Sequence, residues 1–170
     1  MYKVKREMNV RIANREGRRF MTTISRKADI LIKDAKGNTI AVVEVKNIQN
    51  LSRDEVTQFR RNLADFGIPV EAPFYLLLSQ DTGFLWKDSS YENLDLPPMY
   101  EFPMDNVVAR YSHGKAGERL YGAVFEMLAL LWLNNLALQP SDVDKEPEKT
   151  LALSGFINAI QGADVLLEAE

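Results

Sequence analysis

The pattern of hydrophobic and polar positions in the first half of the chain predicts two strands followed by a helix. Residues 25–33 and 39–46 are both rich in β-branched residues, and a turn composition, Asp-Ala-Lys-Gly-Asn, separates them. In residues 51–66, apolar residues recur at helical spacing. Ser52 followed by Glu55 is typical of a capping box, so we expect the helix to begin there.

The two strands are expected to form a β-hairpin with a defined register. If Asp34 pairs with Thr39 across a four-residue loop, the positions of every facing pair sum to 73. This register places Asp29 opposite Glu44.

The second half of the chain predicts a central strand and a largely helical C-terminal part. The apolar run 74–79 is typical of a buried strand, and 83–87 is expected to be its hairpin mate. Residues 88–116 contain three prolines and predict a long loop or lid. Residues 117–138 predict a helix that is apolar on most sides, and 150–170 a C-terminal helical tail.

These elements predict one α/β domain that covers residues 1–170. The expected architecture is a mixed central β-sheet flanked by helices, with an additional C-terminal helical segment. The N-terminal residues leave two interpretations open. Val4, Met8 and Ile12 are spaced for a helix, whereas Val10 and Ile12 followed by Gly17 fit a hairpin.

Composition narrows the possible chemistry. The chain of 170 residues has no cysteine and a single histidine, His113, which we interpret as a plain loop residue. Disulfides, thiol nucleophiles and zinc sites built from Cys or paired His are therefore excluded. A hydrolytic metal site would have to be built from carboxylates, which favour Mg²⁺, Mn²⁺ or Ca²⁺.

Charge is strongly segregated along the chain. Residues 1–61 carry a net charge of +8 and the remaining 109 residues carry −11, which together give the overall −3. A basic first third is typical of a surface that binds a polyanion, although the two halves could equally neutralise each other in the fold. No apolar region follows the first six residues, so we expect a cytoplasmic protein.

One strand carries charges where apolar side chains are expected. In a strand, side chains two positions apart share a face, so Glu44 and Lys46 lie on the same face as Ile40 and Val42. Burying a carboxylate and a lysine beside a facing Asp29 would be costly without a metal ion or an ion pair.

These residues could hold a catalytic divalent ion. The carboxylates of Asp29 and Glu44, the backbone carbonyl of Val45 and water molecules would complete an octahedral oxygen shell. Lys46 could then orient the attacking water or stabilise negative charge on a phosphodiester. Gln58, on the following helix, could reach back to Lys46 or to the water.

The combination of these segments resembles the PD-(D/E)XK, or restriction-endonuclease-like, nuclease superfamily. The resemblance rests on Lys-Ala-Asp-Ile at 27–30, a hairpin, Val-Glu-Val-Lys at 43–46, and a helix with Gln58, within the core motif region 25–87. It is greatest to uncharacterised bacterial nuclease-like proteins with a Phe-Leu-Trp-Lys hairpin after the third core strand.

This resemblance implies a restriction-endonuclease-like core, Mg²⁺ as cofactor with Mn²⁺ able to substitute, and hydrolysis of phosphodiesters in DNA, by an endonuclease. By motif position, Asp29 and Glu44 would be metal ligands, Lys46 the catalytic lysine and Gln58 the helix glutamine. The family proline is replaced by Ala28. The alternatives are a non-catalytic nucleic-acid-binding or assembly module that keeps the fold, and a purely structural partner protein.

Two further expectations concern partners. Basic residues near the proposed site would contact DNA phosphates, namely Arg18, Arg19, Arg26, Lys27 and Arg61. A small nuclease that cuts both strands of a duplex often does so as a dimer. We therefore expect a homodimer, with the apolar helix 117–138 as its interface.

Overall fold

The computed structural model describes residues 8–13, 19–24, 27–112, 120–139 and 142–168. Within these ranges, no helix is both long enough and apolar enough to cross a bilayer. The elements in chain order are β1 (Met8–Ala13), β2 (Arg19–Ile24), β3 (Ile30–Lys33), β4 (Thr39–Val45), α1 (Arg53–Asp65), β5 (Ala72–Leu78), β6 (Thr82–Ser89), η1 (Tyr91–Asn93), β7 (Tyr100–Pro103), α2 (Asp105–Ser112), α3 (Gly122–Leu138), α4 (Glu148–Leu153), α5 (Phe156–Ala159) and β8 (Asp164–Leu167).

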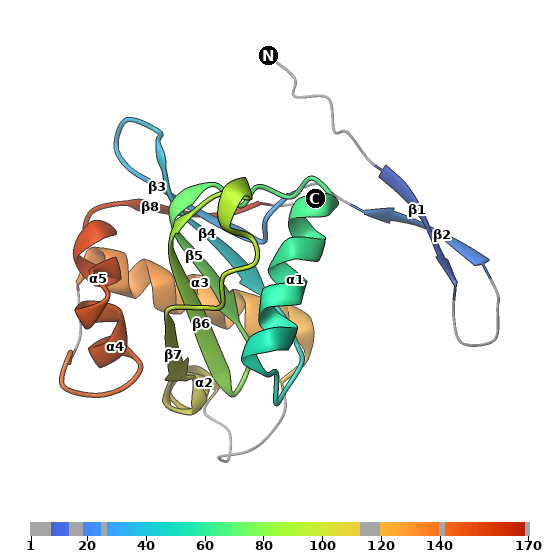
Figure 1. The fold of residues 1–170 in the computed structure, drawn as a ribbon. Helices are drawn as coiled ribbons and strands as arrows, with labels where there is room; N and C mark the ends of the chain where they lie inside the picture. Colours follow the sequence, from blue (N-terminus) through green and yellow to red (C-terminus); the bar gives the residue numbers. More distant parts are fainter. Residues whose placement is uncertain (1–7, 14–18, 25–26, 113–119, 140–141, 169–170) are drawn as a thin grey trace.

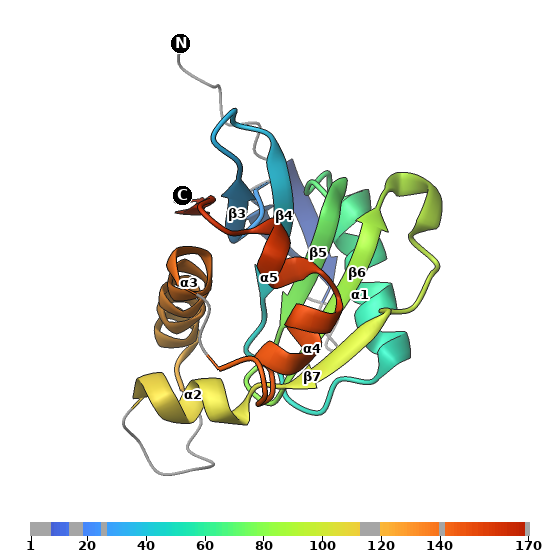
Figure 2. The same ribbon diagram turned by 90° about the vertical axis from the view of Figure 1, so that its left-hand side faces the viewer.

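The fold is α/β, as predicted, with a six-stranded mixed sheet in the order β7-β6-β5-β4-β3-β8. Strands β4 and β5 pair in parallel, and the other neighbours pair antiparallel. Helix α1 covers one face of the sheet, and α2 to α5 lie on the other (Figures 1 and 2). Each face has its own buried apolar cluster, one centred on Val42, Val56 and Leu77 and the other on Val43, Leu76 and Trp132.

The β3–β4 hairpin has the predicted register over its central part. Ile30 pairs with Val43, and Ile32 with Ala41, so the positions sum to 73. The turn is different from the prediction, because a bulge moves the pairing and Lys33, not Asp34, faces Thr39. A bulge puts two successive side chains on one side of the sheet. Ile40 therefore packs with the cluster of Val43, and the expectation that it shares a face with Glu44 is wrong.

Helix α1 forms as its sequence predicts. The Ser52 hydroxyl accepts a hydrogen bond from the Glu55 N–H, and the Glu55 carboxylate accepts one from the Ser52 N–H, which completes the capping box. The hairpin predicted for 74–79 and 83–87 is also confirmed, as strands β5 and β6.

Two predictions for the C-terminal half are wrong. The segment 88–116 is not a long loop, because it contains η1, strand β7 and helix α2. The end of the predicted tail is not helical, because residues 164–167 pair with β3 as strand β8. Both strands lie at sheet edges, where pairing with a distant strand decides the structure. The apolar helix begins later than predicted, at Gly122, because Tyr121 is its N-cap and has an extended backbone. Residues 117–119 of the predicted range lie outside the described residues.

At the N-terminus, the hairpin interpretation agrees with the structure. Strands β1 and β2 pair antiparallel from Met8 with Ile24 to Ala13 with Arg19. They form a sheet of their own, which stands apart from the six-stranded sheet in Figure 1.

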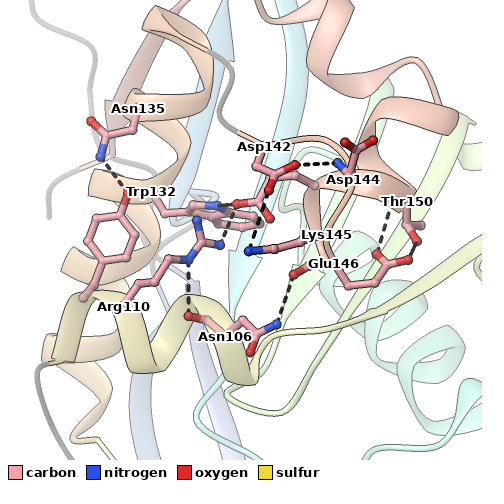
Figure 3. A network of polar contacts seen from close by, with 11 residues as sticks. Asn106, Arg110, Trp132, Asn135, Asp142, Asp144, Lys145, Glu146 and Thr150 are labelled. Atoms are coloured by element: carbon pink, nitrogen blue, oxygen red, sulfur yellow. Dashed lines mark hydrogen bonds and ion pairs between the residues drawn. The ribbon is translucent and has the colours of Figure 1, made fainter.

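A buried ion pair joins the helices on the second face of the sheet. Glu148, at the start of α4, is buried, and its Oε1 accepts from Arg110 of α2 at 2.6 Å and from Nε1 of Trp132 of α3 at 3.3 Å (Figure 3). One carboxylate thus connects three successive helices of the chain.

Candidate functional site

The most unusual buried group is the carboxylate of Glu44, near the end of β4. Strand β4 pairs with β3 on one side and β5 on the other, and α1 covers the face on which Glu44 lies. Only 1% of the Glu44 surface is exposed. Because carboxylates are almost never fully buried without partners, this position requires a compensating charge.

Lys46 supplies part of that compensation. Its Nζ lies 3.3 Å from Oε2 of Glu44, and a quarter of the lysine side chain stays exposed. The other oxygen, Oε1, is buried and has no hydrogen-bond partner among the described residues. Burial, followed by the negative charge of Asp29, raises the pKa of Glu44 from 4.5 to about 8, although Lys46 acts in the opposite direction. The ion pair with Lys46 thus offsets only part of the free-energy cost of burying the charged Glu44.

Asp29 is the second carboxylate of the site. It directly precedes β3, where the hairpin register brings it beside the end of β4. Its Oδ2 accepts a hydrogen bond from the backbone N–H of Val45 at 2.8 Å, and its own carbonyl accepts one from Glu168 at 3.0 Å. The negative charge of Asp29 lies close enough to Glu44 to contribute to its raised pKa. The predicted trio of Asp29, Glu44 and Lys46 is therefore brought together.

A row of buried polar groups continues from Glu44 beneath α1. The hydroxyl of Tyr75, on β5, is buried without a hydrogen-bond partner in the described part of the chain. Burial, and then the charge of Glu44, raises the pKa of Tyr75. Next to it lies the fully buried Arg60, whose guanidinium stacks 5.0 Å from the ring centre of Trp86 and 5.8 Å from that of Tyr75.

Sequence reasoning missed the part that Arg60 and Tyr75 play. Arg60 donates to Oδ1 of Asn93 at 2.6 Å and more weakly to the carbonyl of Leu96, so it anchors the segment that follows β6. A signal was present, because Arg60 is four residues after Val56 and hence on the apolar side of the helix.

The prediction that Gln58 reaches the site is wrong. Gln58 is exposed on α1, and its Nε2 donates to Oδ1 of Asn62 at 2.8 Å. It is two residues from both Val56 and Arg60, which is about 200° around the helix from the side that packs on the sheet. The polar residue that α1 does bury is Arg60.

Two of the five residues predicted to contact DNA are paired with carboxylates in the structure. Arg61 forms an ion pair with Asp95, and Lys27 lies 3.7 Å from Oε2 of Glu168, so nearby carboxylates partly neutralise both. Arg19 begins strand β2. Arg18 and Arg26 lie outside the described residues.

The donor set suits a hard divalent cation such as Mg²⁺. Mg²⁺ typically binds one or two carboxylates and completes its shell with water or phosphate oxygens. Asp29 and Glu44 offer two adjacent carboxylates, and the unpartnered Oε1 of Glu44 is an oxygen that such an ion would satisfy. Within the described residues, no group of three or more Asp, Glu, His or Cys side chains is placed to hold a metal ion. These residues would therefore supply at most two carboxylate ligands.

Comparison with known proteins identified no family model, no curated protein and no solved structure that matches the chain.

Proposed function

We propose that the protein is a divalent-metal-dependent phosphodiesterase of the PD-(D/E)XK type that cleaves DNA. The observation that carries the proposal is the buried carboxylate of Glu44, which has one oxygen without a hydrogen-bond partner in the described part of the chain and lies beside both Asp29 and Lys46. A carboxylate with a strongly raised pKa next to a charged partner is typical of a functional site rather than of a surface ion pair. The cofactor would be Mg²⁺, with Mn²⁺ as substitute.

The trio would provide two metal ligands and one charge-stabilising lysine. Asp29 and Glu44 would hold the ion, with the carbonyl of Val45 as the predicted backbone ligand. The bound ion would polarise a phosphodiester and acidify a coordinated water. Lys46 is bonded to one oxygen of Glu44 and partly exposed, so its ammonium group is suited to stabilise negative charge on the phosphate oxygens.

A DNA substrate is supported by charge and by the motif. The first 61 residues carry a net charge of +8. Lys27 and Arg61 are partly neutralised by carboxylates and Arg60 is buried, so the other basic residues of this part would supply the phosphate contacts that dominate nucleic-acid affinity. The order of Asp29, a hairpin, Glu44 and Lys46 is the one on which the resemblance to DNA nucleases rests.

A second candidate function is a nucleic-acid-binding or assembly module without catalysis. It is favoured by one observation, the outward position of Gln58, which leaves the trio without the helix glutamine. Such a module would bind DNA but would not hydrolyse it.

The test is metal-dependent cleavage by the purified protein. Supercoiled plasmid, linear duplex and single-stranded DNA are incubated with Mg²⁺ or Mn²⁺ and with the variants Glu44→Gln and Lys46→Ala. We expect cleavage that requires the metal and falls by about 10²-fold or more in both variants. DNA retained in a gel shift without cleavage of any form would instead support the binding module.

Glu148→Gln provides the matched control. Glu148 is also a buried glutamate that pairs with a cation, but it lies on the opposite face of the sheet. We expect this variant to keep its cleavage rate, so a loss of activity there would indicate damage to the fold rather than to the site.

A further inference from the structure

Helix α3 exposes a largely apolar stripe, in which Asn135 is the polar position between Leu131 and Leu138. Tyr121 at its N-cap, then Val124, Met127, Leu131 and Leu138, are all between 50% and 85% exposed. From Val124 onward the spacing of three, four and seven residues keeps these side chains on one side of the helix. The opposite side is buried against the sheet through residues such as Phe125 and Trp132. Only one side of α3 is therefore used by the core.

A groove follows the stripe on its α2 side. It has a volume of about 290 Å³ and is lined by Val124, Met127 and Leu131 from α3 and by Tyr111 at the end of α2. The Tyr111 hydroxyl accepts from Nδ2 of Asn135 at 2.6 Å, which holds α2 against α3 at this edge. The stripe and groove together form one apolar surface.

The chain segment nearest in sequence is poorly suited to cover this surface. Residues 113–119, between α2 and α3, read His-Gly-Lys-Ala-Gly-Glu-Arg and include no large apolar side chain. In contrast, α3 has only one charged residue, Glu126, in its 17 positions. A second apolar helix is a better chemical match than a charged, glycine-containing segment.

We propose that the α3 stripe is a homodimer interface, in which α3 packs antiparallel on α3 of a second copy around a two-fold axis at Leu131. The proposal goes beyond the proposed nuclease function and does not depend on it.

The spacing of the stripe is what such symmetry requires. In a two-fold contact one surface must be complementary to itself. Val124 and Leu138 each lie seven residues from Leu131, so in the antiparallel pair Val124 faces Leu138 of the second copy. Met127 and Asn135 each lie four residues away and face each other likewise. Leu131 meets Leu131 at the axis.

The area is sufficient for a specific dimer. The exposed portions of the five large apolar side chains amount to roughly 500 Å² per protomer, at the upper end of what a monomer exposes in one patch. Two copies would bury about twice that area, and the α2 edge of the groove adds to it. This reaches the ~1,000 Å² that a biological interface needs.

The first test is sedimentation velocity of the full chain from about 1 to 100 µM. We expect a reversible dimer, and we expect Leu131→Glu to raise its dissociation constant roughly thirtyfold or more, because a charge is placed at the centre of the contact. Leu96→Glu is the matched control, since Leu96 is 52% exposed compared with 53% for Leu131 and lies on the α1 side. That variant should dimerise as the wild type does.

The absence of cysteine allows a second test of the geometry. Under mild oxidation, Leu131→Cys should crosslink to itself far faster than Leu96→Cys. Val124→Cys and Leu138→Cys should crosslink when mixed, but neither should crosslink alone, because identical positions lie about 21 Å apart along antiparallel helices.

Four results would overturn the proposal. The first three are a monomer at all concentrations, equal effects of Leu131→Glu and Leu96→Glu on dimerisation, and equal crosslinking of Leu131→Cys and Leu96→Cys. A monomer would leave the stripe to a different partner. Crosslinking of Val124→Cys with itself would indicate a parallel pair and would contradict the antiparallel register.

Discussion

The Asp29 carboxylate accepts a hydrogen bond from the backbone N–H of Val45 at 2.8 Å. This bond fixes the end of the β3 segment to the strand that carries Glu44 and Lys46. It uses Oδ2 of Asp29, whereas Glu44 keeps a buried oxygen without a partner among the described residues. The hairpin therefore positions the two carboxylates before any ligand binds, which lowers the cost of organising a site.

The raised pKa of Glu44 predicts how stability depends on pH in the presence of a chelator. The folded protein holds a proton on Glu44 up to a pH of about 8, whereas the unfolded chain releases it above about 4.5. The contribution of this group to the free energy of unfolding is therefore present below pH 4.5 and is lost as the pH rises towards 8. Glu44→Gln cannot ionise, so we expect its stability relative to wild type to increase by roughly 3 kcal/mol between pH 5 and pH 8.

The measurement is urea unfolding of both proteins at pH 5 and pH 8 with EDTA. The difference in unfolding free energy between variant and wild type should grow from the lower to the higher pH. Parallel pH profiles would contradict the buried, protonated state of Glu44.

Arg60 and its neighbour Arg61 should differ strongly in their effect on stability. Arg60 is fully buried, stacks on Trp86 and donates to Asn93, so Arg60→Ala leaves a cavity and unpaired acceptors. We expect a loss of about 3 kcal/mol or more. Arg61 is largely solvated in its pair with Asp95, and Arg61→Ala should cost no more than about 1 kcal/mol. Equal losses in thermal unfolding would contradict this placement.

Substitution of Arg110 should destabilise the protein more than substitution of its buried partner Glu148 (Figure 3). Arg110→Ala leaves the buried carboxylate of Glu148 with Trp132 as its remaining side-chain donor, at a cost of about 3 kcal/mol. Glu148→Gln keeps an acceptor oxygen, and Arg110 is 42% exposed and can turn to water, so we expect a cost of about 1 kcal/mol. Chemical denaturation of the two variants measures the order, and the reverse order would show that the arginine is not what offsets burial of the carboxylate.

Gln58 should be dispensable for the proposed reaction. It is exposed and bonded to Asn62, so we expect Gln58→Ala to change the DNA cleavage rate by less than about threefold. Loss of a group that contacts the reacting atoms would lower the rate by about 10² or more. A fall of that size, with unchanged stability, would mean that α1 turns or shifts when substrate binds.

Much of the first half of the fold could be predicted, because its signals are local. The capping box at Ser52 and Glu55 and the presence of a turn between β3 and β4 each depend on residues close in sequence, although the pairing at the turn itself differs from the prediction. The register of the β3–β4 hairpin places Asp29 beside Glu44, so the trio could be predicted from the sequence.

What could not be predicted depends on distant partners. Strand β8 is a strand because β3 offers it an edge, and the bulge that moves Ile40 is a property of strand pairing rather than of the turn composition. The burial of Arg60 needed Trp86 and Asn93, which are more than 25 positions away. The polar character of Gln58 does not show which side of α1 it occupies, whereas its position two residues from both Val56 and Arg60 places it on the side away from the sheet.

The most direct test of the proposed site is calorimetric titration of the protein with Mn²⁺ at pH 8. We expect saturable binding by wild type and by Glu148→Gln, and a loss of that binding in Asp29→Asn and Glu44→Gln. No binding by the wild type, or binding that persists in Glu44→Gln, would contradict the assignment of Asp29 and Glu44 as the metal ligands.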